Sequence, residues 1–86
     1  ATQAIEVDFA KKWAEAIGQS LNYAMQTGKR PAVALILLAP ADNKYIERVR
    51  KISAEYALGL TIYPIDGGGV SGTTNKQFWK ILPSKS

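Results

Sequence analysis

Histidine and cysteine are both absent from this sequence. Without cysteine, the chain cannot form disulfide bonds or use thiolate chemistry. Without histidine, it lacks the usual general base and the commonest metal ligand. Any catalytic site must therefore be built from carboxylates, lysines or hydroxyl groups.

Long hydrophobic runs are missing as well. The longest, residues 32–41, is about half the length of a membrane-spanning helix and does not lie where a signal peptide would. We therefore expect a soluble, intracellular protein with no membrane partner. Of the 86 residues, 47% are apolar and 21% charged, which is typical of one small globular domain. The net charge of +4 is compatible with a nucleic-acid partner.

The first part of the chain predicts a strand followed by a helix. Residues 4–9 alternate apolar and acidic side chains, so Glu6 and Asp8 share one face of the strand. The other face carries Ile5, Val7 and Phe9. Residues 10–27 repeat apolar side chains at helical spacing, and Gly28 is a typical C-terminal stop. The expected buried set of this helix is Ala10, Trp13, Ala14, Ile17, Leu21, Ala24 and Met25.

The next part predicts two further strands around a second helix. After a connector at residues 29–31, the apolar run 32–38 is typical of a central strand covered by helices on both faces. A second helix is expected from residue 43 to about residue 58, and a third strand over residues 60–65. Pro64 favours the end of that strand or a sheet edge. The second helix is expected to bury Ile46, Val49, Ile52 and Tyr56.

This order of elements predicts a β-α-β-α-β core over residues 1–66. Residues 67–86 begin with a glycine run and end in the largely apolar segment 77–82. The glycine run lacks the Lys-Ser/Thr pair of a phosphate-binding loop, so we expect a linker. The segment after it is expected to be an extra strand or a docking segment.

Five polar residues are arranged along the first strand and helix, namely Glu6, Asp8, Lys12, Gln19 and Tyr23. This arrangement resembles the PD-(D/E)xK nuclease superfamily, in which a strand carries an acidic residue and, two positions on, a lysine, and a helix follows. In the RecB-like branch that helix carries Gln-x-x-x-Tyr, which residues 19–23 match. The resemblance to small bacterial proteins of this superfamily covers about residues 4–65.

The resemblance implies a restriction-endonuclease-like fold, a three-layer α/β/α core with a small mixed sheet. It also implies Mg²⁺ bound by Glu6 and Asp8, and hydrolysis of phosphodiester bonds in nucleic acid. The catalytic residues would be Glu6, Asp8 and Lys12. Asp8 stands where the lysine is usual, and Lys12 would supply the amine from the helix. Gln19 and Tyr23 would bind substrate or steady the site.

Part of the implied site has no counterpart here. The upstream acidic residue of the superfamily comes from a strand before Glu6, and only five residues precede Glu6. Taken alone, the chain therefore favours a non-catalytic descendant that binds nucleic acid or protein, and an inactive fragment is a third alternative. Glu6 and Asp8 are equally compatible with an ordinary polar strand face.

The first strand of such a chain would expose an edge of the sheet. We therefore expect a second copy of the chain, a partner chain or a preceding segment to pair with it.

Overall fold

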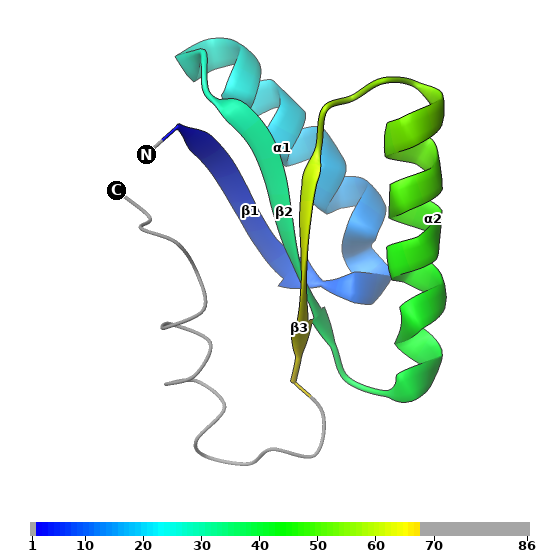
Figure 1. Ribbon diagram of the computed structural model, residues 1–86. Coiled ribbons are helices and arrows are strands. Elements are labelled where there is room, and N and C mark those ends of the chain that lie inside the picture. The colour runs from blue at the N-terminus through cyan, green and yellow to red at the C-terminus, as the bar shows by residue number, and fades with distance from the viewer. Residues whose placement is uncertain (1, 68–86) are drawn as a thin grey trace.

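The computed structural model describes residues 2–67, which form three strands and two helices in the predicted β-α-β-α-β order (Figure 1). The strands are β1 (Gln3–Phe9), β2 (Arg30–Leu37) and β3 (Thr61–Asp66). The helices are α1 (Trp13–Thr27) and α2 (Asn43–Glu55). Short 3-10 turns, η1 (Ala10–Lys12) and η2 (Pro40–Asp42), precede them. The expected tail at residues 67–86 lies, apart from residue 67, outside the described residues.

The sheet is parallel throughout, with strand order β1-β2-β3. This confirms β2 as the central strand and places Pro64 on an edge strand. The expectation of a mixed sheet was wrong. A helix joins each strand to the next and returns the chain to the same end of the sheet, so consecutive strands run in the same direction.

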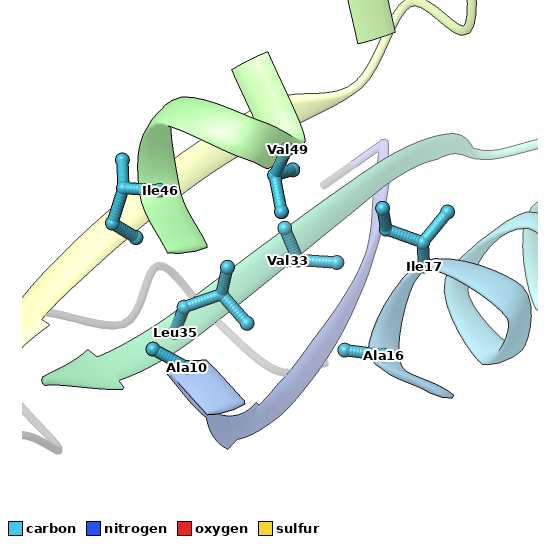
Figure 2. Packing of buried hydrophobic residues seen from close by; sticks show 7 residues of the cluster. All are labelled: Ala10, Ala16, Ile17, Val33, Leu35, Ile46 and Val49. Carbon is cyan, nitrogen blue, oxygen red and sulfur yellow. The ribbon is translucent and has the colours of Figure 1, made fainter. Parts of the chain in front are cut away.

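Both helices lie on one face of the sheet (Figure 1). Right-handed crossovers between neighbouring strands in this order place successive helices on the same side. The main core lies there, with Val33 and Leu35 of β2 between the two helices (Figure 2). The helices contribute Ala16, Ile17, Ile46 and Val49. Residues 2–67 therefore form two layers, and the expected helix on the opposite face is not among them.

The opposite face of the sheet is also apolar. We call it the second face, and it carries Ile5, Val7, Ala34, Tyr63 and Ile65, which pack together in a second cluster. No helix in the described part of the chain belongs to this cluster. The strands thus carry apolar side chains on both sides, as strands of parallel sheets usually do.

The predicted C-terminal end is confirmed for α1 but not for α2. Gly28 ends α1 as predicted, with a left-handed φ of 74° and its N–H bonded to the Ala24 carbonyl at 2.8 Å. In contrast, α2 ends at Glu55, about one turn before the predicted end. Ala57, two residues after Glu55, has a φ of 51°, which an alanine rarely adopts, and this left-handed conformation does not continue the helix.

Several residues expected in the core are exposed. Met25 and Tyr56 retain 76% and 70% of their surface, and Ala14 is exposed as well. Tyr56 follows the last residue of α2, so the shortened helix no longer directs it inward. Residues 10–12 form a 3-10 turn before the α-helix, which begins at Trp13.

Ser20 is a buried polar residue of α1 that contacts the sheet near the start of β2. That strand begins with Arg30 and Pro31, which were predicted as part of the connector. Pro31 pairs with Ala4 but has no N–H to donate to β1. The Ser20 hydroxyl lies 2.9 Å from the carbonyls of both Ala4 and Ala32, and it accepts the Ala32 N–H at 2.9 Å. One side chain of α1 therefore satisfies backbone groups of two strands.

We expect Ser20→Ala to lower the free energy of unfolding by about 1–3 kcal/mol, because it leaves buried backbone groups without a partner. Urea denaturation followed by circular dichroism measures this change. Asn22→Ala, on the exposed side of the same helix, is the matched control and should cost about 0.5 kcal/mol or less. Equal losses in the two variants would show that the Ser20 bonds contribute nothing specific.

Candidate metal-binding site

Glu6 and Asp8 project from the face of β1 on which the helices pack. Glu6 pairs with Val33 and Asp8 with Leu35, and paired residues of neighbouring strands project to the same side. Val33 and Leu35 belong to the core under the helices. The predicted sharing of one face by the two acidic residues is therefore confirmed.

This placement differs from that of an ordinary solvated acidic face. Glu6 and Asp8 are both half-buried on the side where α1 packs, whereas the apolar Ile5 and Val7 point to the helix-free side. Removing a carboxylate from water costs free energy unless a cation or hydrogen-bond donors compensate it. The pair therefore occupies a position where a bound cation would be stabilising.

The two carboxylates have different surroundings. Asp8 Oδ1 accepts the Phe9 N–H at 2.8 Å, which holds the chain where β1 turns into η1. Its second oxygen has no such contact within residues 2–67. The Glu6 carboxylate makes no hydrogen bond or ion pair with another described residue. Glu6 therefore has both oxygens available, and Asp8 has one.

The other three candidate residues lie on the first helical segment. Lys12 is exposed at the junction of η1 and α1. Gln19 and Tyr23 are exposed one turn apart on α1, and Tyr23 retains 50% of its surface. No hydrogen bond within the described part of the chain links any of them to Glu6 or Asp8. The structure thus groups the candidates in pairs, one on β1 and one on α1, with Lys12 between them along the chain.

The available oxygens fit an open magnesium site better than a closed one. Mg²⁺ is commonly held by one or two protein carboxylates, with water and phosphate oxygens completing its octahedral shell. Glu6 and Asp8 are two positions apart and therefore neighbours on one strand face, with about 7 Å between their Cα atoms, so both side chains can reach one such shell. Residues 2–67 contain no group of three acidic, histidine or cysteine side chains arranged to hold a metal. Any further protein ligand would have to come from outside them.

The outer edge of β1 is where such a ligand would enter. In the described sheet β1 pairs with β2 alone, so its other side is an edge with backbone groups available for pairing. A strand added there would place side chains beside Glu6 and Asp8. The predicted exposed edge is confirmed within residues 2–67, and the segment expected to cover it stays a prediction.

The sequence reading missed Ser20 as a positioning residue. Ala16, Ser20 and Ala24 are all buried and recur every fourth position, so they form a small-residue stripe along α1. Small side chains let a helix approach a sheet closely. The four-residue spacing is present in the sequence, but a search for apolar residues at helical spacing does not include serine.

We expect Mg²⁺ to stabilise the protein through Glu6 and Asp8. At ten times its dissociation constant, a ligand that binds only the folded state raises the free energy of unfolding by about 1.4 kcal/mol. Glu6→Gln and Asp8→Asn should both remove this increment, which thermal or urea denaturation with and without Mg²⁺ measures. Asp8→Asn keeps a carbonyl oxygen for the Phe9 N–H, so the turn after β1 is preserved.

Glu47→Gln is the matched control for this measurement, since Glu47 is exposed on α2. It should retain the full stabilisation by Mg²⁺. The same increment in the wild type and in all three variants would indicate nonspecific binding and would reject the site.

Comparisons with known proteins add no relative to this picture. No protein-family model matches the chain, and neither a curated protein nor a solved structure matches it. None of the helices in the described part of the chain has the length and apolar character needed to cross a membrane.

Proposed function

We propose that this chain carries the strand-helix half of a PD-(D/E)xK nuclease-like site for Mg²⁺-dependent hydrolysis of phosphodiester bonds in nucleic acid. The observation that supports it is the position of Glu6 and Asp8. Both are half-buried on the helix side of an edge strand, and α1 with its Gln-x-x-x-Tyr segment follows at once. That order of elements is the one on which the resemblance rests.

Each residue has a distinct part in this proposal. Glu6 and Asp8 hold the metal ion, which supplies charge neutralisation at the phosphate and a more acidic bound water. Lys12 carries a flexible ammonium group at the start of the helix, which suits it to orient a water or a phosphate oxygen. Gln19 and Tyr23 offer an amide and a phenol on one exposed flank, where they contact substrate.

Completion of the site requires a further acidic residue. In this proposal it comes from a strand that pairs with the outer edge of β1, supplied by a second copy, a partner chain or another segment of the protein. The net charge of +4 favours association with a polyanionic substrate.

A second candidate is a non-catalytic descendant that binds nucleic acid or protein. It is favoured by Asp8, which stands in place of the usual lysine and has one oxygen engaged by the Phe9 N–H. In that case Asp8 holds the turn after β1, and the loss of the catalytic amine leaves the fold as a binding module.

Cleavage of plasmid and single-stranded DNA in the presence of Mg²⁺ or Mn²⁺ tests the first candidate. Where a second copy or another segment of the protein supplies the further acidic residue, the wild type cuts DNA in a metal-dependent manner. We expect this cutting to fall by at least about 100-fold in Glu6→Gln, since loss of a group that stabilises transition-state charge has effects of this size. Asp8→Asn should lose activity as well, and Lys12→Met should lower the rate with little effect on metal binding.

Glu47→Gln again serves as the control and should cut like the wild type. Cutting that is indifferent to Glu6 and Asp8 would indicate a contaminant and reject the enzyme proposal. Metal binding without cutting, combined with retention of labelled nucleic acid in a gel-shift assay, would favour the non-catalytic candidate.

A further inference from the structure

The second face of the sheet is an apolar surface without a helix in the described part of the chain. Its centre is formed by Ala34 and Ile65, with relative exposures of 0% and 3%. Around them Ile5, Val7 and Tyr63 are half-buried, and the Tyr63 hydroxyl donates to Gln3 Oε1 at 2.7 Å at the rim. Parallel sheets are almost always covered on both faces, so this surface calls for a covering segment.

The last described residue, Gly67, lies next to a side chain of this face. Gly67 donates its N–H to the Leu37 carbonyl at 2.8 Å and so continues beside the end of β2. A Cβ built on Gly67 would lie 2.6 Å from Cγ2 of Ile36, so the backbone there passes in close contact with that side chain. Ile36 pairs with Ile65 and therefore projects from the second face. The last described residue therefore already contacts the second face.

The sequence that follows includes an apolar segment of suitable size. Residues 77–82 read Gln-Phe-Trp-Lys-Ile-Leu, with two aromatic and two branched aliphatic side chains. Residues 67–76 separate this segment from β3, and ten residues extend over at most about 35 Å. Three strands span only about 10 Å between the outer two, and a strand of seven residues is about 23 Å long. Residues 77–82 can therefore reach any part of the second face.

We propose that residues 77–82 of the same chain pack on the second face of the sheet and form the third layer of the domain. The tether favours this occupant over a second copy, because a short linker gives an effective concentration in the millimolar range. The position of Gly67 next to the Ile36 side chain favours this face over the edge of β1 or the outer side of the helices. The proposal is independent of the metal site, since Glu6 and Asp8 project from the other face.

Trp79 is the natural reporter for this contact. The chain contains two tryptophans, and Trp13 is partly buried against the main core. In the Trp13→Phe variant of the 86-residue chain, Trp79 is the one remaining tryptophan. We expect its fluorescence to be blue-shifted and its quenching by acrylamide to be at least several-fold weaker than in urea. Both properties should be independent of protein concentration.

Substitutions on the face itself locate the contact. Ile5→Lys, made in the Trp13→Phe background, places a charge on the second face at an edge strand and should raise Trp79 quenching toward the value in urea. Met25→Lys, at a 76% exposed position on α1, is the matched control and should leave the quenching unchanged. Circular dichroism checks that each variant is folded. If Ile5→Lys does not fold, Thr61→Lys replaces it, because Thr61 pairs with Ala32 on the same face.

Three results would overturn the proposal. Trp79 quenched equally in the native protein and in urea would show that the segment does not pack at all. Protection of Trp79 that persists in a folded second-face variant would place the segment elsewhere. Protection that increases with protein concentration would show that a second copy of the chain covers the face.

Discussion

The hydroxyl of Ser20 is the contact on which the arrangement of this unit depends. Its oxygen accepts the Ala32 N–H of β2 at 2.9 Å and lies 2.9 Å from the carbonyls of Ala4 in β1 and Ala32 in β2, between which its single hydrogen is shared. These bonds lie beside Pro31, which has no backbone N–H to donate within the β1–β2 ladder. A buried hydroxyl with satisfied partners fixes both the distance and the rotation of a helix, because any other rotation would leave buried polar groups unpaired.

The rotation of α1 determines which side chains are available for function. With Ser20 and its neighbours Ala16 and Ala24 against the sheet, Gln19 and Tyr23 remain on the exposed flank. The same contact seats the helix on the face of β1 from which Glu6 and Asp8 project. One buried serine thus sets the relation between the acidic pair on the strand and the polar pair on the helix, although it takes no part in either.

The strands and helices could be predicted from the sequence, but the face of the sheet on which the helices pack could not. Alternation in residues 4–9 and helical spacing in residues 10–27 predict the first strand and helix, and they place Glu6 beside Asp8. Alternation does not say which face meets the helices, since that depends on the handedness of the crossover and on neighbouring strands. Tyr56 was misplaced because periodicity does not predict where a helix stops. A search for apolar residues at helical spacing does not find Ser20, because its side chain is polar.

Two surfaces of this three-stranded sheet are available for further contacts, the outer edge of β1 and the second face. Within residues 2–67, the outer edge of β1 has no strand paired with it and borders the acidic side chains, so a strand added there changes the chemistry of the site. The second face has apolar side chains and no helix among residues 2–67, so a segment packed there changes the stability of the domain. The edge would bind a strand through backbone hydrogen bonds, whereas the second face would bind a segment through hydrophobic contact. Failure of the metal-site proposal would therefore leave the packing proposal unaffected, and the reverse also holds.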